Sequence, residues 1–499
     1  MRIINNNKDI IEHIKSFANP RIWILIILVS MLFLFCLFIF KQNIILAISI
    51  AFAPLLIILF FIIISFSDKG FYPVYISHFL LLMINSYIDI KLGIVTVILT
   101  IAIFMLIIIK GTYNKIEWKQ SINPMLWAYS LWTAYCILEV ANPNHVQEAW
   151  NVSITQHVIY PLVCAILVPL TIKKKNQIHW LLIIWSVFII FATIKGYLQK
   201  NHGFNERELY FLYELGGAKT HLIWSGIRFF SIFTDAANYG VHMGMAIIGF
   251  GISTIYTKNK CLKIYYIFIS TAAIYGMFIS GTRAAIAVPM AGILLFTILS
   301  NNIKIFSLSA FIGVVTFVFF SFTTIGDSNQ NIRRMRTAFN PTKDASFQVR
   351  KNNQREIKIL LSDKPFGYGI GLAGKSDKYQ SIEQIKYPPD SWIINIWIDT
   401  GIVGLTIYIL IHLFLFIYSS WRLMFKFKNY YQKGLLSAWL CVNFGYFVAA
   451  FANDIMQYPN SIVIYTGFAL CITFPYSIKS SNINLNKSIN VSSINKELK

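Results

Sequence analysis

The sequence predicts an all-α fold: a polytopic membrane helix bundle of about 12–14 transmembrane helices, with one large, partly helical extracytoplasmic loop. Of the 499 residues, 56% are hydrophobic and only 13% are charged, about half the charged fraction of a soluble domain. Apolar runs of about 20 residues, the length that crosses a bilayer, recur along the chain. One polar stretch, 323–389, interrupts them, and at about 67 residues it is longer than a plain connection.

The hydropathy pattern predicts about fourteen membrane spans, each a run of about 16–27 mostly apolar residues. The third and fourth form a tight hairpin around Lys91. The first is too long for a cleavable signal, and no small-residue cleavage site precedes the second. The predicted spans are 22–40, 44–66, 74–90, 93–109, 125–140, 154–172, 179–196, 236–256, 264–280, 283–299, 304–322, 391–417, 434–452 and 460–476.

Lysine and arginine predict the orientation of these spans, because they concentrate in cytoplasmic connections. Alternate connections hold basic clusters, whereas the short connections 141–153 and 453–459 hold none. Both termini are therefore expected in the cytoplasm and the loop 323–389 outside. Long loops translocate despite their charge, so the basic residues of this loop do not reverse the orientation. The clusters are Lys110, Lys115 and Lys119; Lys173, Lys174 and Lys175; Lys258, Lys260 and Lys263; and Arg422, Lys426, Lys428 and Lys433.

This pattern divides the chain into four parts. A second outer segment, about 197–234, precedes the eighth span. Within the long loop, Asp344 can cap a helix that runs to about Ser362, where Asp363-Lys-Pro365 stops it. The expected parts are an N-terminal transmembrane bundle (1–322), the extracytoplasmic loop (323–389), the C-terminal transmembrane helices (390–476) and a cytoplasmic tail (477–499).

Charge and cysteine content exclude several function classes. The net charge of +22 would suit a nucleic-acid binder, but the basic residues are scattered over short connections, as membrane topology requires. No nucleic-acid partner is therefore expected. The six cysteines lie in or beside apolar runs, and the long loop holds none. Neither a disulfide-stapled outer domain nor a metal site is expected.

The run Gly369-Ile-Gly-Leu-Ala-Gly-Lys375-Ser376 matches the phosphate-binding-loop pattern. That motif binds nucleotide when a buried strand feeds the loop and a helix follows it. Here a charged helix and Pro365 precede the run, and topology places it outside, where ATP is scarce. We interpret the match as accidental, and expect a flexible, glycine-permitted turn near the membrane surface and no cofactor.

Two arginines stand at the outer mouths of predicted spans. Arg228 precedes the eighth span, and Arg283 lies in the very short outer turn Ser280-Gly-Thr-Arg283. Each alone could be a snorkelling anchor. With Arg350 and Arg355 of the long loop they face one outer vestibule, and a guanidinium fork binds phosphate oxygens bidentately without losing its charge. The set indicates a diphosphate-bearing ligand at the outer membrane surface.

Asp235, Asn238 and His242 follow Arg228 at helical spacing and share one face at the start of the eighth span. Polar residues inside a span face the bundle interior or a cavity. Two interpretations follow: hydrogen bonding between helices, or a substrate-binding role in the same vestibule.

Asp390 stands just before the last large span. It could cap that helix, or it could be the carboxylate that accepts a proton from a sugar hydroxyl, as general-base catalysis requires. Asn395 and Asp399 follow it within the span. Four outer-side histidines are alternatives for the base, namely His145, His157, His202 and His221.

Three stretches around the long loop occur in a specific order. They are Arg228-Phe-Phe-Ser-Ile-Phe-Thr-Asp-Ala-Ala-Asn238; Ser280-Gly-Thr-Arg283-Ala-Ala; and Arg350 with Pro365-Phe-Gly-Tyr-Gly-Ile-Gly371, followed by Asp390-Ser-Trp-Ile-Ile-Asn-Ile-Trp-Ile-Asp-Thr-Gly401. In this order they resemble the bacterial O-antigen ligase and O-antigen polymerase superfamily. The resemblance covers about 190–410.

The resemblance implies a metal-independent membrane glycosyltransferase that joins undecaprenyl-diphosphate-linked glycan units at the periplasmic face of the bacterial inner membrane. Its partners would be that lipid-linked glycan, a glycan acceptor, the bilayer, a flippase and a chain-length regulator. Carried over residue by residue, Arg228 and Arg283 would hold the diphosphate leaving group, and Arg350 would support the loop. The family's ligases place a histidine eleven residues before the exit glycine, where this chain has Asp390 before Gly401. This departure favours a polymerase over a ligase.

Two alternatives to the polymerase stay open. The first is an O-antigen ligase that transfers glycan to lipid A core or another acceptor. The second, from another class, is a transporter of lipid-linked glycan or polysaccharide. Transporters contain internal repeats and broken spans at the membrane midplane. The chain shows no repeat, and its charges cluster at the outer face, which favours the enzyme.

Overall fold

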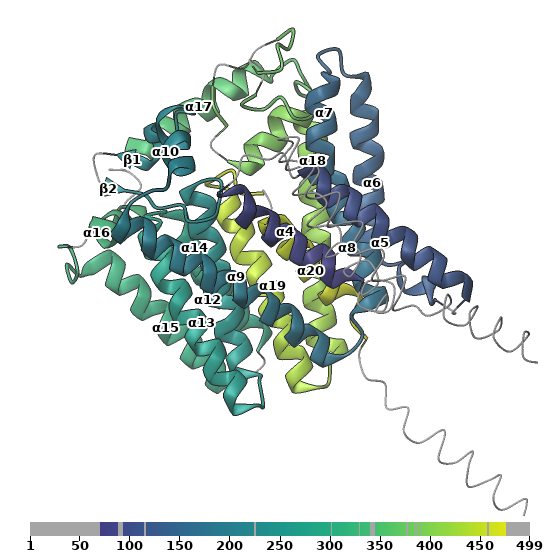
Figure 1. Ribbon diagram of the computed structural model, residues 1–499, viewed down its shortest axis with the longest axis vertical. Coiled ribbons are helices and arrows are strands. Elements are labelled where there is room, and N and C mark those ends of the chain that lie inside the picture. Colours follow the sequence, from purple (N-terminus) through teal and green to yellow (C-terminus); the bar gives the residue numbers. More distant parts are fainter. Residues whose placement is uncertain are drawn as a thin grey trace, which may run out of the picture. The chain divides into compact units, whose positions relative to one another are not determined.

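The computed structural model describes residues 70–87, 93–113, 116–223, 226–300, 302–328, 330–339, 345–375, 378–383, 385, 387–389, 391–456 and 459–475. These residues form a bundle of helices (Figure 1). The predicted spans 22–40 and 44–66, the tail 477–499, the helix cap Asp344 and the candidate base Asp390 lie outside the described residues.

The predicted all-α class is confirmed. Within the described part of the chain, strands are limited to β1 (Leu222–Ile223) and β2 (Gly226–Ile227), one short antiparallel pair. The α-helices are α4 (Phe71–Asn85), α5 (Gly93–Tyr113), α6 (Pro124–Leu138), α7 (Gln147–Ile154), α8 (Tyr160–Thr171), α9 (Lys175–His202), α10 (Glu206–Tyr213), α11 (Ala218–His221), α12 (Ala236–Ile255), α13 (Lys260–Ile279), α14 (Ala284–Leu299), α15 (Ile303–Phe322), α16 (Gln330–Arg336), α17 (Ala345–Leu360), α18 (Trp392–Trp421), α19 (Tyr430–Ala450) and α20 (Asn460–Thr473). Short 3₁₀ or π segments are η2 (Trp118–Gln120), η3 (Glu139–Ala141), η4 (Thr155–Ile159), η5 (Thr337–Phe339) and η7 (Arg422–Lys426).

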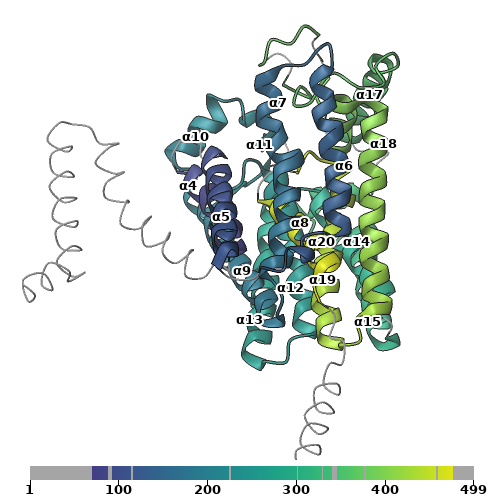
Figure 2. The ribbon, with the colours of Figure 1, turned by 90° about the vertical axis from the view of Figure 1, so that its right-hand side faces the viewer.

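The polytopic membrane class is also confirmed. Among the described residues, six helical stretches are long and apolar enough to cross a membrane, and four shorter apolar helices accompany them. Helices α8, α18 and α19 pack along α20 (Figure 2). The six are Gln147–Thr171, Lys175–His202, Lys260–Ile279, Ile303–Phe322, Trp392–Lys426 and Tyr430–Ala450.

Helix α12 forms the centre of the bundle and packs against α13, α14 and α19. Small residues permit this close packing. A Cβ atom on Gly244 would lie 2.7 Å from the carbonyl oxygen of Ala285, and one on Gly445 would lie 2.2 Å from that of Val288. Both glycines bring a helix backbone directly onto α14, as small residues do where membrane helices cross.

The glycine-rich run 366–374 is a turn that needs glycine, as expected, with φ of 109° at Gly369 and 87° at Gly371. Hydrogen bonds join it to α18. The Asp399 carboxylate accepts the N–H groups of Gly371 (2.9 Å) and Ala373 (2.8 Å). At Gly401 α18 is kinked, with φ of 64°. The irregular backbone is thus held against protein, as its polar groups require near a membrane.

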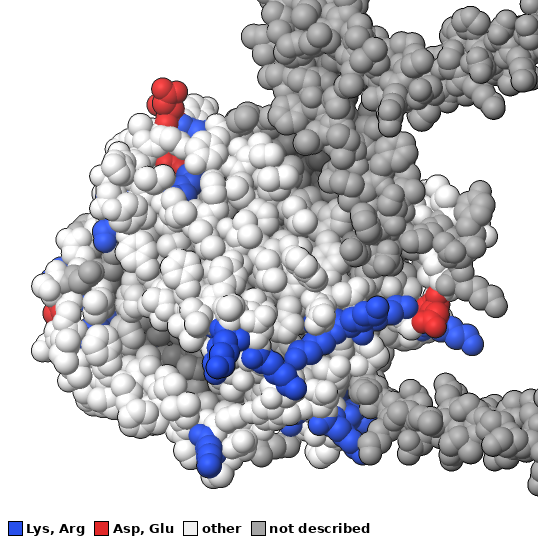
Figure 3. Space-filling model, turned by 60° about the horizontal axis from the view of Figure 1, so that its bottom comes forward, with Lys and Arg blue, Asp and Glu red and all other residues white. Residues whose placement is uncertain are grey.

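One end of the bundle carries a band of basic side chains. Figure 3 shows Lys and Arg side chains in a band across one end, called the basic end below. Contacts there join distant connections: Lys173 pairs with Glu117 at 3.3 Å, and Lys175 and Lys258 both lie over the ring of Tyr431. The opposite end, called the outer end, carries α10 and α17 (Figure 1).

Candidate functional site

A cavity of about 420 Å³ opens at the outer end, between the start of α12, the start of α14 and the connection from α19 to α20. It is called the outer cavity below. Four guanidinium groups and two carboxylates line it. They are Arg228, Arg283, Arg334, Arg350, Asp235 and Asp454. The residue before Asp390, Pro389, also lies on the wall.

Arg228 follows the β1–β2 hairpin, and two local hydrogen bonds orient its guanidinium. Nη1 donates to the carbonyl oxygen of Thr220 (3.1 Å) and Nη2 to Oγ1 of Thr282 (3.0 Å). Its Nε is buried without a hydrogen-bond acceptor. Burial lowers the pKa of Arg228 to about 10; Asp235 opposes this shift, and Arg283 and Arg350 add to it. The guanidinium group stays charged at neutral pH. An anion that entered the cavity would reduce the repulsion among these arginines.

The other arginines come from segments far apart in the chain. Arg283 stands at the start of α14, and its Nη1 donates to Oγ1 of Thr337 in η5 (3.3 Å). Arg334 belongs to α16. Arg350 lies on α17, and its Nη2 donates to Oδ1 of Asn453 (3.5 Å). The loop helices α16 and α17 therefore close the cavity that the membrane helices begin.

Asp235 is the N-cap of α12. Its Oδ1 accepts the N–H groups of Ala237 (2.7 Å) and Asn238 (2.8 Å), and its Oδ2 accepts from the side chain of Asn238 (2.6 Å). These bonds satisfy the free N–H groups at the helix start. The carboxylate therefore borders the outer cavity while its oxygens are already occupied.

Asn238 and His242 continue this chain of hydrogen bonds into the bundle. Asn460 of α20 donates to Oδ1 of Asn238 (2.9 Å), and Nδ1 of His242 lies 2.7 Å from Oδ1 of Asn460. Trp185 of α9 donates to Nε2 of His242 (2.8 Å). Nδ1 is therefore the protonated nitrogen. This geometry favours helix-to-helix hydrogen bonding for both residues, since neither lines the outer cavity.

His221 is the one of the four alternative histidines that reaches the outer cavity. Its Nε2 accepts the N–H of Ala236 at the start of α12 (3.1 Å), and its Nδ1 lies 2.9 Å from the carbonyl oxygen of Gly217. Burial is the main cause that lowers the pKa of His221. Both ring nitrogens are used in holding a neutral ring, so His221 is poorly placed to accept a proton from a ligand.

Asp454 lines the outer cavity but was not predicted from the sequence. It lies in the connection from α19 to α20 and faces the outer cavity. Its Oδ1 is buried without a hydrogen-bond partner. Burial raises the pKa of Asp454 to about 6, although Asn395 and Lys375 oppose the shift. The sequence feature that could have identified Asp454 is an acidic residue in a short connection that contains no Lys or Arg.

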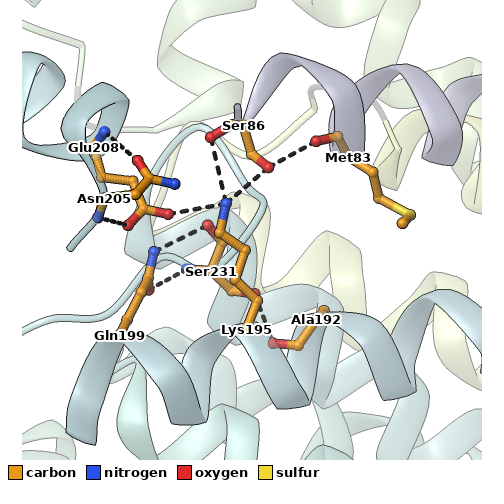
Figure 4. A network of polar contacts seen from close by, with 8 residues as sticks. All are labelled: Met83, Ser86, Ala192, Lys195, Gln199, Asn205, Glu208 and Ser231. Atoms are coloured by element: carbon orange, nitrogen blue, oxygen red, sulfur yellow. Dashed lines mark hydrogen bonds and ion pairs between the residues drawn. The ribbon is translucent and has the colours of Figure 1, made fainter. Parts of the chain in front are cut away.

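A buried polar network holds the outer segment in place (Figure 4). Lys195 of α9 pairs with Glu208 of α10 at 2.9 Å and donates to Oγ of Ser86 (2.8 Å). Gln199 donates to the carbonyl oxygen of Ser231 (3.1 Å) and accepts its N–H (2.8 Å). Ser231 has φ of 54°, a backbone conformation that is strained for any residue other than glycine. These contacts fix the segment that runs from the cavity arginine to α12.

The structure thus brings together three of the predicted arginines, Arg228, Arg283 and Arg350, and adds Arg334. Arg355 lies on α17 but is exposed and outside the cavity wall. Among the described residues, no group of His, Cys, Asp and Glu could hold a metal ion. The cavity wall presents planar guanidinium groups to a ligand, and such groups recognise phosphate.

The fold and this cavity define a multi-pass membrane protein with a cationic site at one end of the bundle. Residues 268–409 match the family model described as O-antigen ligase. The match confirms the predicted resemblance to the O-antigen ligase and polymerase superfamily, whose members are glycosyltransferase-like enzymes. No curated protein matches the chain.

Proposed function

We propose that this protein is a membrane glycosyltransferase that joins polyprenyl-diphosphate-linked glycan units, a surface-polysaccharide polymerase. The observation that carries the proposal is the convergence of four arginines on one cavity, at the starts of α12 and α14. A volume of about 420 Å³ falls within the roughly 300–1,000 Å³ of ordinary ligand pockets. The donor diphosphate would bind there, with its polyprenyl chain in the bilayer.

In this mechanism an acceptor hydroxyl oxygen attacks the anomeric carbon of the donor glycan. The new C–O bond forms as the bond from that carbon to the diphosphate oxygen breaks, and the polyprenyl diphosphate leaves with the electron pair. Arg228 and Arg283 stabilise the charge that develops on the leaving group. Fixed donors aimed at developing charge supply the largest part of many rate enhancements.

The proton of the acceptor hydroxyl goes to a carboxylate on the cavity wall. Asp454 has the appropriate environment, because its pKa of about 6 lies near working pH and one oxygen is unpartnered. A general base is most efficient when its pKa is close to the operating pH. Asp390, predicted from the sequence, is the competing assignment, and its neighbour Pro389 lines the same cavity.

The ligase remains the second candidate, since the matched family model is described as O-antigen ligase. Asp390 at the position of the ligases' histidine favours the polymerase. Glycan analysis of a deletion strain separates the two. Single repeat units on the surface indicate a lost polymerase. Long chains that remain on the polyprenyl carrier indicate a lost ligase.

The experiment that tests the site replaces Arg228 or Arg283 by Lys in a strain that lacks the chromosomal copy. A snorkelling anchor tolerates Lys, whereas a bidentate phosphate clamp does not. We expect Arg228→Lys and Arg283→Lys each to lower the rate by about 10²–10³, by analogy with other transition-state donors. The matched control is Arg333→Lys, an exposed neighbour of Arg334 on α16 that lies off the cavity wall. Normal chains from both cavity variants would refute the site.

We further propose that the protein resides in the bacterial inner membrane, with both termini cytoplasmic and the outer cavity periplasmic, where a flippase delivers the donor and a chain-length regulator acts. Two cysteine positions test the orientation. Cys261 is exposed at the basic end, and Ser328 is exposed on the loop after α15. In spheroplasts of a Cys36→Ser strain, an impermeant thiol reagent should label Ser328→Cys and leave Cys261 unlabelled. The reverse pattern would overturn the orientation.

A further inference from the structure

A second cavity, of about 340 Å³, opens at the basic end between the start of α9 and the connection from α12 to α13. It is called the basic cleft below. Lys175, His179, Trp180, Lys258 and Asn259 are among its lining residues. We propose that the basic cleft binds the phosphate head group of an anionic phospholipid. The proposal needs only the membrane placement of the chain and is independent of the proposed enzyme reaction.

The positive charges in the basic cleft favour binding of an anion. The ammonium groups of Lys175 and Lys258 lie 4.9 and 4.3 Å from the centroid of one ring, that of Tyr431. In the described part of the chain neither forms an ion pair with Asp or Glu, although the nearby Lys173 pairs with Glu117 at 3.3 Å. Two like charges that share one aromatic ring repel each other, and a phosphate between them would relieve this repulsion.

The surface beside the basic cleft is apolar and faces outward. Trp180 at its rim is 56% exposed, and Trp is the side chain typical of the membrane–water boundary. Further along the same helices, Val187 of α9 and Ile264 and Phe268 of α13 are 55%, 68% and 58% exposed. Side chains of this kind on membrane-spanning helices contact acyl chains.

These features together select a lipid over a free phosphate compound. A soluble anion would use only the two lysines. An anionic phospholipid would place its phosphate between Lys175 and Lys258 and lay its acyl chains along α9 and α13. Basic pockets between membrane helices bind anionic head groups in this way. Each lysine near an anionic surface strengthens binding about fivefold, so the pair should contribute about 25-fold.

The test measures lipid retention by native mass spectrometry of the full chain, released from nanodiscs made of equal parts phosphatidylglycerol and phosphatidylcholine. Wild type should retain phosphatidylglycerol in preference to phosphatidylcholine. The double variant Lys175→Gln/Lys258→Gln should lose this preference, with apparent affinity reduced about 25-fold. The matched control is Lys260→Gln/Lys263→Gln, which removes the same charge from the exposed start of α13 outside the cleft.

Three outcomes would overturn the proposal: equal retention of both lipids by wild type, equal loss in the control variant, or displacement of phosphatidylglycerol by millimolar inorganic phosphate. The last would identify a site for soluble phosphate. A charge-conserving variant, Lys175→Arg/Lys258→Arg, guards against misfolding, because it should keep the lipid preference. Glycan polymerisation reports on the outer cavity separately, so failure of either proposal leaves the other standing.

Discussion

The outer cavity and the basic cleft are both cationic, but they are built from different residues. Arginines line the outer cavity, and hydrogen bonds to Thr220, Thr282 and Asn453 hold two of them in place. Lysines line the basic cleft, and the described contacts of the two central ones are to the ring of Tyr431. The first site is a set of oriented guanidinium groups, and the second is a pair of ammonium point charges on flexible stems.

This difference indicates that guanidinium groups suit catalysis and that ammonium groups suit attachment of a ligand. Catalysis on a leaving group requires donors held in the transition-state geometry, which planar guanidinium groups supply. Attachment of a head group requires only positive charge within reach, which an ammonium on a flexible stem supplies. The comparison therefore predicts that exchange between Arg and Lys is costly at the outer cavity and tolerated at the basic cleft.

The largest expected effect concerns the buried ion pair between Lys195 and Glu208, which holds the segment beside the outer cavity. Glu208→Gln leaves Lys195 buried without its carboxylate partner, and breaking a buried pair costs about 3–5 kcal/mol. Thermal unfolding in detergent should show a much lower midpoint. The control is Glu383→Gln, which breaks the more exposed pair with Lys364 and should cost less than about 1 kcal/mol. Equal midpoints for the two variants would show that the buried network does not hold the cavity.

The next effect concerns the base. Asp454→Asn removes the proton acceptor and should lower the rate by about 10²–10⁴. In wild type the base acts only when ionised, so activity should fall as the pH drops below about 6, the raised pKa of Asp454. The control Asp363→Asn changes an exposed carboxylate off the cavity wall. If Asp390→Asn removes activity while Asp454→Asn retains it, the base assignment moves to Asp390.

The smallest effect concerns the accidental phosphate-loop match. Lys375 is exposed, and its charge is one of the influences that lower the pKa of Asp454. Lys375→Ala should therefore move the acid limb of the pH profile upward and change the rate by less than about fivefold, the scale of an exposed charge pair. Loss of all activity at a normal protein level would revive the nucleotide interpretation.

Much of the fold and part of the candidate site were accessible from the sequence, for a physical reason. Membrane spans fix which residues lie at which boundary, so arginines next to span ends, Arg228 and Arg283, were predicted to share one face. Asp454 was missed because no sequence pattern shows that the side chain of a residue in a short connection points toward a cavity. Arg334 was missed because α16 carries several arginines and the sequence does not show which one points inward.

Arg355 illustrates the same limit from the other direction. Five residues along an α-helix correspond to a rotation of about 140°, so Arg350 and Arg355 cannot both face one cavity. The helix itself was predicted, but its contact face was not, because that face is set by tertiary packing. The two carboxylate oxygens of Asp399 present a further case, since their bonds to the glycine run depend on a turn geometry that composition alone does not give.

The most direct test of the central claim, that the outer cavity is a diphosphate clamp, is the affinity of the purified protein for polyprenyl diphosphate. It should be measured for wild type, Arg283→Lys and the basic-cleft variant Lys258→Arg. We predict that Arg283→Lys weakens binding about 10- to 100-fold, the range for a lost charge-assisted hydrogen bond, and that Lys258→Arg matches wild type. Equal affinity of wild type and Arg283→Lys would contradict the account.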